Sequence, residues 1–576
     1  MTATDHHLLL RALIDEFVRC GMRHACTSPG SRNTPIVITL ARESALRTWS
    51  HIDERSSGFF ALGAAKASGR PVAVTCTSGT AAANLLPAVI EARHAGVPLI
   101  LLTADRPPEL RDIGAGQTID QLKLYGDAVK WFFELGVHGA SAERLRWVRE
   151  LACRAYWTAL DGTPGPVHIN VALQEPLILE GPLPDSEPGG GGRPGGAPWT
   201  AHSHPAPANH DPQPLQLERA VLVAGDLGVE TSDGGHGGPT LGSRLARLAA
   251  QARLPLLADP LSGARSGPAA IAHWDLILRD PQTAAALRPA VVYRFGETPT
   301  SKPLRAWLDA LDVPQVQVLA DARWSDPVSR ATTRVVGPVA AFLERFTPLA
   351  DQSDWLDRWT RADSAVAHAI AEPLLPAGLS EPAVVTALAQ FLPSTATLFV
   401  AASMPIRDVE EFFPALNDPP RVLANRGANG IDGTVACAFG VAATTTEPVV
   451  LLTGDVTLAH DIGSLLAARR TGLKLTIVLL NNDGGGIFNF LAVAGESDVF
   501  EPQIATPTGL DFSLAAALYG LDHQLVSDLD AFAGSLIAAL RSERSTIIEV
   551  RTERVANREL HARVAASALT ALAATR

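Results

Sequence analysis

Short apolar segments that each end in a polar, glycine-containing turn recur along this chain of 576 residues. Residues 449–453 and 475–480 are the clearest pair, because both are rich in Val, Ile and Leu and both are too short to cross a membrane. Between them, apolar residues recur at helical spacing after Asp461, which we expect to cap the helix, and Gly472 stands where that helix would end. The pattern predicts a strand–helix–strand unit with parallel strands.

Polar side chains follow both of these predicted strands. Asp455 comes directly after the first strand, and Asn482 follows the second, 27 positions later. Because ligands bind beyond the carboxyl ends of strands in open α/β sheets, we expect the two side chains to lie close together. A carboxylate, an amide and free loop carbonyls form an oxygen site that suits Mg²⁺ holding a phosphate. For either turn alone, an ordinary surface loop is the alternative explanation.

The same alternation along the whole chain predicts an α/β protein with three domains, each a mainly parallel sheet flanked by helices. Residues 181–215 are rich in Pro and Gly, and we expect them to form a flexible linker. The predicted domains are residues 1–180, 216–350 and 375–576.

Composition excludes several classes of function. The net charge of −12 argues against nucleic acid or an anionic membrane as a partner. No apolar run reaches the roughly 18 residues of a membrane helix, and the N-terminal segment has Asp and Glu within its apolar part, unlike a signal peptide. The five cysteines are scattered without a C-x-x-C motif, which favours reduced thiols and a cytoplasmic protein.

Cations follow the ends of several predicted strands or lie in adjoining loops. In an acidic protein this placement predicts a pocket for carboxylates, because Arg pairs with a carboxylate through two parallel hydrogen bonds. Arg32 also precedes a predicted helix N-terminus, which suits an anion, although a solvated Arg in an ordinary turn explains it equally well. The six cations are Arg32, Arg106, Arg111, Lys302, Arg407 and Arg426.

Glu54 opens a predicted helix, residues 56–69, whose many Ala and Gly residues allow close packing. Taken alone, a carboxylate in the first turn is explained by helix capping and the helix dipole.

The pairing of Gly454-Asp455 with Asn481-Asn482 resembles the signature of thiamine diphosphate (ThDP) enzymes. This resemblance implies that Mg²⁺, or Mn²⁺ in its place, is bound by the side chains of Asp455 and Asn482 and by the Gly484 carbonyl. It also implies that Glu54 hydrogen-bonds the aminopyrimidine ring and promotes the tautomer that takes the proton from the thiazolium C2.

Four longer segments narrow the resemblance: TSPGSRNTP, ADRPPELRDIGAGQ, NRGANGIDG and NNDGGGIFNFL. Together they are similar to the MenD family, the 2-succinyl-5-enolpyruvyl-6-hydroxy-3-cyclohexene-1-carboxylate (SEPHCHC) synthases of menaquinone biosynthesis. The segments lie in the first and third predicted domains, whereas the central domain adds little. The resemblance implies a ThDP- and Mg²⁺-dependent transferase that decarboxylates 2-oxoglutarate and adds the resulting succinic semialdehyde carbanion to isochorismate, giving SEPHCHC and CO₂.

The resemblance also implies a role for each polar residue at the strand ends, since two dicarboxylates in one pocket need a cationic lining. Gly116 stands where the family commonly has Asn, so we expect no side-chain contact there. The residues expected to hold the succinyl carboxylate and nearby donor atoms are Ser403, Arg407 and Arg426, and those expected to orient isochorismate are Ser31, Arg32, Arg106, Gln117 and Lys302. The cofactor would rest on Ile431 and be lined by Ile487, Phe488 and Ser403, and the catalytic residues would be Glu54, Arg32, Arg407 and Arg426.

Glu54 and Asp455 lie in different predicted domains. In this fold the cofactor bridges the first domain of one subunit and the third of another, so the resemblance implies a homodimer at minimum and, by analogy, a homotetramer. Another ThDP-dependent 2-oxo acid decarboxylase or carboligase stays an alternative, as does a protein of this fold that binds ligand without turnover. A flavin-containing synthase and a nicotinamide dehydrogenase are disfavoured, because no G-x-G-x-x-G follows a strand in the central domain.

Overall fold

The computed structural model describes residues 2–184, 191–202, 215, 217–228, 240–346 and 353–575. Contacts between Cα atoms divide the chain into two compact units. The first unit comprises Met1–Pro205, Asn425–Thr446 and Asp461–Leu473, and the second comprises Ala206–Ala424, Glu447–His460 and Lys474–Arg576.

The domain boundaries expected from the sequence stay predictions. By the contact criterion, Asn425–Thr446 and Asp461–Leu473 of the expected third domain cluster with the first unit. Much of the expected linker, residues 185–190 and 203–214, lies outside the described residues.

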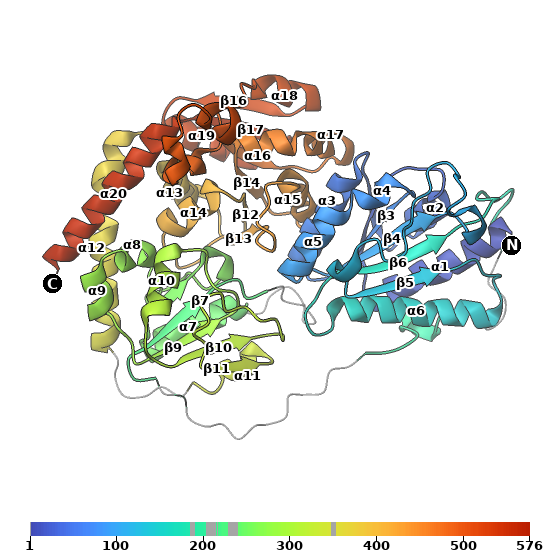
Figure 1. The fold of residues 1–576 in the computed structure, drawn as a ribbon, viewed down its shortest axis with the longest axis horizontal. Coiled ribbons are helices and arrows are strands. Elements are labelled where there is room, and N and C mark those ends of the chain that lie inside the picture. Colours follow the sequence, from blue (N-terminus) through green and yellow to red (C-terminus); the bar gives the residue numbers. More distant parts are fainter. Residues whose placement is uncertain are drawn as a thin grey trace. The chain divides into compact units, whose positions relative to one another are not determined.

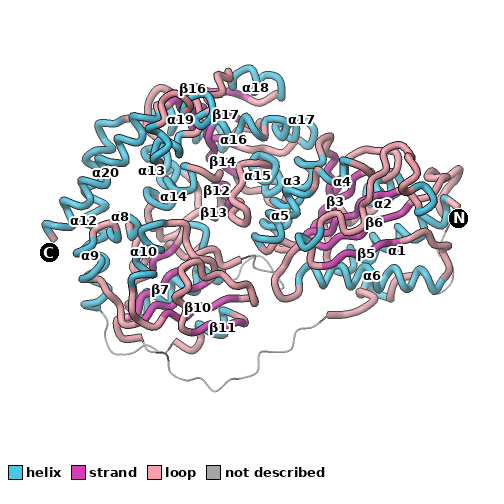
Figure 2. Tube along the Cα trace, in the orientation of Figure 1, coloured by secondary structure: helices cyan, strands magenta, loops and turns pink. Residues whose placement is uncertain are grey.

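The first unit is built on a six-stranded parallel sheet in the order β2-β1-β3-β4-β6-β5. Figure 1 labels β3, β4, β5 and β6 of this sheet, and Figure 2 draws its strands in magenta. Every residue of β3, β4 and β6 is buried, as expected for apolar strands covered on both faces. The strands are β1 (His24–Thr27), β2 (Arg47–Ser50), β3 (Val72–Cys76), β4 (Leu99–Asp105), β5 (Trp131–Leu135) and β6 (Val167–Ala172), and the helices are α1 (Ala3–Cys20), α2 (Thr34–Arg42), α3 (Glu54–Ser68), α4 (Thr80–Ala83), α5 (Leu86–Ala95), α6 (Ala142–Leu160), α15 (Thr434–Ala442) and α17 (Leu466–Thr471).

Helices α3 and α15 pack against each other through glycines. A Cβ atom added to Gly63 would lie 2.0 Å from the carbonyl oxygen of Cys437, and one added to Gly440 would lie 2.0 Å from that of Phe60. The two backbones therefore approach more closely than any side chain would allow, which confirms the close packing predicted from the small residues of α3.

The second unit contains two parallel sheets, with strand orders β11-β10-β9-β7-β8 and β13-β12-β14-β15-β17-β16. The strands of the first of these sheets are β7 (Ala220–Ala224), β8 (Leu256–Ala258), β9 (Val291–Phe295), β10 (Gln315–Leu319) and β11 (Thr333–Val336), and those of the second are β12 (Thr397–Val400), β13 (Arg421–Ala424), β14 (Val449–Gly454), β15 (Thr476–Asn481), β16 (Asp522–Val526) and β17 (Thr546–Arg551). The helices are α7 (Leu241–Ala252), α8 (Trp274–Leu278), α9 (Pro281–Ala286), α10 (Lys302–Ala310), α11 (Val339–Leu343), α12 (Ser353–Ala377), α13 (Glu381–Phe391), α14 (Met404–Phe412), α16 (Asp455–His460), α18 (Phe512–Tyr519), α19 (Leu529–Arg541) and α20 (Arg554–Ala574).

The connection between β14 and β15 differs from the single capped helix that we predicted. It consists of α16, a short 3₁₀ helix (Ile462–Leu465) and α17, and Asp461 forms no capping hydrogen bond. Instead, the buried Asp461 carboxylate accepts hydrogen bonds from the Ala436 N–H at 3.0 Å and from the Ser464 hydroxyl at 2.7 Å. The prediction of a cap was wrong because a tertiary contact uses the carboxylate. Gly472 does end the last helix, with a left-handed φ of 68°.

Three parallel sheets accompanied by helices confirm the α/β fold class expected from the sequence. Among the described helices, none combines the length and the apolar character that crossing a membrane requires.

Candidate active site

The two strand ends singled out in the sequence meet at one edge of the second unit's six-stranded sheet. β14 and β15 are parallel neighbours in which Gly454 pairs with Leu480, so Asp455 and Asn482 follow their strands at the same edge. The buried Asp455 carboxylate accepts a hydrogen bond from the Gly484 N–H at 2.8 Å through Oδ2. Burial raises the pKa of Asp455 to about 6, although this hydrogen bond favours the charged form.

Asn482 leaves one polar atom without a partner. Its Nδ2 donates to Oε1 of Glu381 at 2.8 Å, whereas its Oδ1 is buried and accepts no hydrogen bond within the described residues. A buried acceptor without a donor is costly unless a ligand satisfies it. Because a carboxylate, an amide oxygen and nearby carbonyls are hard oxygen donors, this set fits Mg²⁺.

Gly484 sits at a position that only glycine suits. Its φ is 141°, and an added Cβ would lie 2.7 Å from the carbonyl oxygen of Ala505. Ile487 and Phe488 follow in a 3₁₀ helix (Gly486–Phe490), and both are half-buried. The loop therefore brings Gly484 and these two apolar residues to the strand end that carries Asn482.

Sequence reasoning missed two residues beside this site. Glu381 begins α13, and its Oε1 accepts hydrogen bonds from both Asn482 and the Thr552 hydroxyl, the latter at 2.9 Å. Glu381 is 1% exposed, and burial raises its pKa to about 7. No local motif connects Glu381 and Thr552 with Asn482.

The N-terminus of α14 carries two further predicted residues of the second unit. Ser403 precedes the helix with a positive φ of 73°, and Arg407 donates a hydrogen bond to the Ser403 carbonyl oxygen. Burial lowers the pKa of the Arg407 guanidinium, although Glu410 and Asp408 oppose the shift. Lys302 is the exposed first residue of α10.

Glu54 lies in the first unit, where it is the first residue of α3. The capping role belongs to Asp53, whose Oδ1 accepts a hydrogen bond from the Arg55 N–H at 2.8 Å. Glu54 is half-buried near the end of β3, where its charge adds to burial in raising the pKa of the Cys76 thiol. Glu54 therefore does not supply the capping hydrogen bond, although it lies in the first turn of the helix, where the dipole favours a carboxylate.

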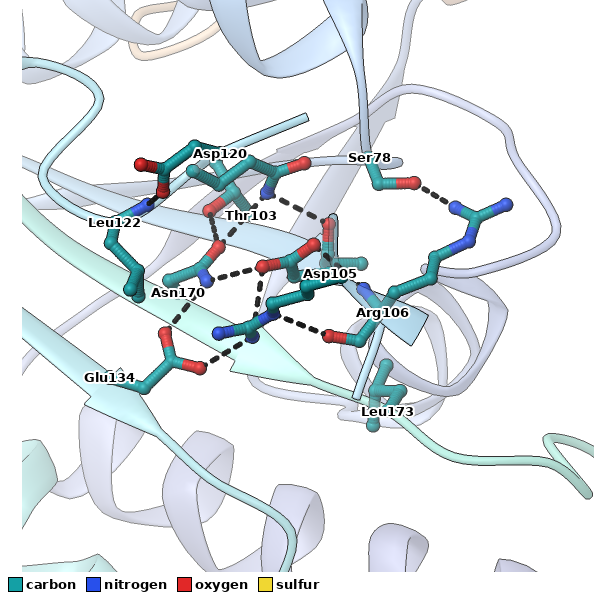
Figure 3. A network of polar contacts seen from close by, with 12 residues as sticks. Ser78, Thr103, Asp105, Arg106, Asp120, Leu122, Glu134, Asn170 and Leu173 are labelled. Atoms are coloured by element: carbon teal, nitrogen blue, oxygen red, sulfur yellow. Dashed lines mark hydrogen bonds and ion pairs between the residues drawn. The ribbon is translucent and has the colours of Figure 1, made fainter. Parts of the chain in front are cut away.

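Arg106 and Gln117 both contact Ser78 in the first unit, and Figure 3 shows the contact of Arg106 with the Ser78 hydroxyl. Arg106 donates to the Ser78 hydroxyl, Gln117 Nε2 donates to the Ser78 carbonyl oxygen at 3.1 Å, and the Ser78 hydroxyl donates to the Gln117 carbonyl oxygen at 3.1 Å. Burial and the nearby charge of Arg32 lower the pKa of Arg106. An anion beside Arg32 and Arg106 would relieve this repulsion.

The other cations differ in what neutralises them. Arg32 Nη1 donates to the Leu173 carbonyl oxygen at 2.9 Å, and its guanidinium pairs with the exposed Glu175 at 3.3 Å. Arg111 forms ion pairs with the buried Asp105 at 2.9 Å and with Glu134 at 2.7 Å. Figure 3 shows Asp105 and Glu134 joined to Asn170 in the same network. Two carboxylates therefore already neutralise Arg111, and its part in the expected carboxylate pocket stays a prediction.

The remaining predicted residues lie in loops of the first unit. Arg426 and Ile431 are half-buried in the segment between β13 and α15, and Ser31 is exposed before α2. Gly427 and Ala428 anchor that segment by donating backbone hydrogen bonds to the Glu91 carboxylate. A Cβ added to Gly116 would meet no atom within 4 Å.

Models of three protein families match successive parts of the chain. Residues 9–124 match "Thiamine pyrophosphate enzyme, N-terminal TPP binding domain", residues 196–400 match "Middle domain of thiamine pyrophosphate", and residues 407–550 match "Thiamine pyrophosphate enzyme, C-terminal TPP binding domain". These matches, together with the oxygen site at the strand ends, define a thiamine diphosphate-dependent enzyme.

Curated relatives narrow this class. The chain is 43% identical over 565 residues to the 2-succinyl-5-enolpyruvyl-6-hydroxy-3-cyclohexene-1-carboxylate synthase of Geobacillus kaustophilus, and the match covers 96% of each chain. The protein of the same name from Chloroflexus aurantiacus is 41% identical, and the match covers 95% of this chain and 93% of that protein. The one from Haloarcula marismortui is 40% identical, and the match covers 96% of each chain. The chain belongs to the SEPHCHC synthase family, which confirms the predicted resemblance, enzyme class and cofactor.

Proposed function

We propose that this protein decarboxylates 2-oxoglutarate and joins the remaining four-carbon unit to isochorismate, releasing SEPHCHC and CO₂. The reaction follows from the name that its relatives carry. The observation that supports it most strongly is the site at the ends of β14 and β15. There the buried Asp455 carboxylate is hydrogen-bonded to the loop that carries Asn482, whose amide oxygen accepts no hydrogen bond within the described residues.

Asp455, Asn482 and the Gly484 carbonyl would hold Mg²⁺, or Mn²⁺ in its place, and the metal would bind the cofactor's diphosphate. Ile487 and Phe488 would exclude water from the cofactor, with Ile431 and Ser403 as further contacts. When bound, ThDP supplies the electron sink that permits loss of CO₂ from a 2-oxo acid.

Glu54 would hydrogen-bond the cofactor's pyrimidine ring and hold a proton at that ring nitrogen. Asp53 leaves Glu54 available for this role, because Asp53 caps the helix. A carboxyl group within hydrogen-bond reach of a ring nitrogen can share a proton with it.

The cations would bind the substrates' carboxylates. Arg407 and Arg426 would pair with the carboxylate of the four-carbon unit, with Ser403 beside them. Arg32 and Arg106, held by backbone and Ser78 contacts, would orient isochorismate and offset the repulsion between two dicarboxylates. The further residues proposed to contact isochorismate are Ser31, Gln117 and Lys302.

The proposed assembly is a homodimer at minimum, and a homotetramer by analogy with the fold, because the proposed residues for the pyrimidine and diphosphate ends of the cofactor belong to different units of the chain. A cytoplasmic location is supported by the five cysteines, all of which are buried free thiols.

The test is to incubate the purified protein with ThDP, Mg²⁺, 2-oxoglutarate and isochorismate and to follow CO₂ release and loss of isochorismate together. The proposal predicts one CO₂ for each isochorismate consumed. Replacing 2-oxoglutarate by pyruvate tests for another 2-oxo acid decarboxylase, and Asp455→Ala is the inactive control. CO₂ release from pyruvate at the 2-oxoglutarate rate would favour the alternative substrate class.

A further inference from the structure

Two adjacent asparagines at the end of β15 make the same contact through nitrogen but differ at oxygen. Asn481 Nδ2 donates to Glu549 Oε1, and Asn482 Nδ2 donates to Glu381 Oε1, both at 2.8 Å. Asn481 Oδ1 accepts a hydrogen bond from the Asp483 N–H at 3.2 Å. Asn482 Oδ1 is buried and, within the described residues, accepts none. One amide is therefore satisfied at both ends, and the other presents an unused acceptor.

The partner of Asn482 nitrogen is held firmly in place. Glu381 is the first residue of α13, is 1% exposed, and accepts a second hydrogen bond from the Thr552 hydroxyl at 2.9 Å. A carboxylate offers acceptors, whereas an amide has a donor end and an acceptor end. Facing a carboxylate, the amide of Asn482 must turn its NH₂ toward Glu381 and its oxygen away.

We infer that Glu381 is a positioning residue that fixes the amide of Asn482 so that its oxygen, and not its NH₂, is presented to the metal ion. The inference rests on the proposed assignment of Asn482 as a ligand. An amide turned by half a rotation would direct N–H groups at a cation, and partners that orient a ligand typically change metal affinity about 10–100-fold when removed.

The first experiment titrates Mg²⁺ into the full-length protein at saturating ThDP and measures the dissociation constant for the metal by calorimetry. Glu381→Leu is expected to weaken Mg²⁺ binding by at least about 10-fold. Glu549→Leu is the matched control, because it removes the same kind of contact from Asn481, whose oxygen has a local donor. The Mg²⁺ affinity of Glu549→Leu is expected to stay within about 3-fold of wild type, a smaller change than the roughly 10–100-fold loss that follows removal of a partner that orients a metal ligand.

A second pair of variants avoids the loss of a buried side chain. Asn482→Asp alone places two carboxylates against each other, so Mg²⁺ binding is expected to weaken. Adding Glu381→Gln to that variant supplies an amide that donates to the new carboxylate, and binding is expected to recover at least about 10-fold. Charge alone predicts the opposite, since the second substitution removes a negative charge near a cation.

Two results would overturn the inference: wild-type Mg²⁺ affinity in Glu381→Leu, or a double variant that binds Mg²⁺ no more tightly than Asn482→Asp. Either result decides the case if the other variant does not fold. Asp455→Ala separates this failure from failure of the metal site. If Asp455→Ala loses Mg²⁺ while Glu381→Leu keeps it, the site stands and only the role of Glu381 is rejected. If Asp455→Ala also binds normally, the ligand assignment itself is wrong.

Discussion

The Asp455 carboxylate accepts a hydrogen bond from the Gly484 N–H at 2.8 Å, although 29 positions separate the two residues. This contact joins the loop after β15 to the end of β14. It places a buried anion beside a loop whose Asn482 oxygen lacks a partner within the described residues. A divalent cation would offset the cost of both features.

Replacing Asp455 by Ala should abolish Mg²⁺-dependent ThDP binding, because it removes the only charged ligand we assign. Calorimetric titration of ThDP with and without Mg²⁺ measures the effect. Asp226→Ala is a matched control, since Gly225-Asp226 also follows a strand and Asp226 accepts a local hydrogen bond from the Gly228 N–H at 2.9 Å. Wild-type affinity in Asp455→Ala would contradict the metal assignment.

Binding of Mg²⁺ should also depend on pH. Burial raises the pKa of Asp455 to about 6, and only the carboxylate form binds the metal, so protons compete. Affinity should be full well above this pKa and fall about 10-fold per pH unit below it. Asp455→Asn should bind Mg²⁺ weakly, and its Mg²⁺ affinity should lack the part of the pH dependence that comes from protonation of Asp455. An identical slope in both proteins would assign the titration to another group.

Glu54→Gln should leave ThDP affinity nearly unchanged and slow hydrogen–deuterium exchange at the cofactor's C2, by about 10²–10⁴-fold if Glu54 acts in general acid–base catalysis. Nuclear magnetic resonance of quenched samples measures this exchange. Asp53→Asn keeps a residue that caps helices equally well and should exchange at the wild-type rate. Unchanged exchange in Glu54→Gln would remove Glu54 from the mechanism.

Arg407→Ala should lower kcat/KM for 2-oxoglutarate. The lost transition-state stabilisation should be about 2–5 kcal/mol, as expected when a desolvated carboxylate loses its partner. Arg407→Lys keeps the charge but loses the planar pairing, so it should recover only part of the activity. Steady-state kinetics, with 2-oxoglutarate and isochorismate varied in turn, measure the effect of each variant on each substrate. Arg358→Ala, on the exposed surface of α12, is the control. Unaltered kinetics in Arg407→Ala would reassign this residue.

The contact between α3 and α15 gives a prediction about stability. Gly440→Ala should lower the unfolding free energy by about 1–3 kcal/mol, because its Cβ would meet the Phe60 carbonyl oxygen at 2.0 Å. Gly534→Ala in α19 meets no atom within 4 Å and should instead gain about 0.5–1 kcal/mol. Thermal unfolding of both variants measures the difference. A stabilised Gly440→Ala would show that the helices separate at no cost.

That Asp455 and Asn482 follow neighbouring strand ends could be predicted from sequence, because general rules connect these ends. Continuous apolar segments indicate buried parallel strands, and parallel strands bring their carboxyl ends to one edge. The pairing of Asp455 with Asn482 therefore follows from the amino-acid pattern alone. The orientation of the Asn482 amide does not follow from that pattern, because it depends on distant residues. Glu381, which contacts Asn482, lies 101 positions from it in the sequence, and Thr552, which contacts Glu381, lies 171 positions from Glu381.

Other features escaped prediction for similar reasons. β10 (QVQVL) and β16 (DHQLV) interrupt their apolar residues with polar ones, so neither shows the continuous apolar segment that predicts a buried strand. Asp461 has the local pattern of a cap, yet a contact with Ala436 takes its carboxylate. Arg111 occupies a strand-end loop like the cations proposed to bind substrate, but Asp105 and Glu134 neutralise it. In each case a tertiary contact outweighs the local preference.

The central claim, that Asp455 and Asn482 hold the metal, is tested most directly by a crystal structure of the holoenzyme with Mn²⁺ in place of Mg²⁺. Anomalous scattering locates the ion without reference to the protein. We predict one peak at about 2.1–2.2 Å, close to the Mg²⁺ distance, from an Asp455 carboxylate oxygen, Asn482 Oδ1 and the Gly484 carbonyl. A peak beside other residues, or an Asn482 amide with its NH₂ toward the ion, would contradict the account.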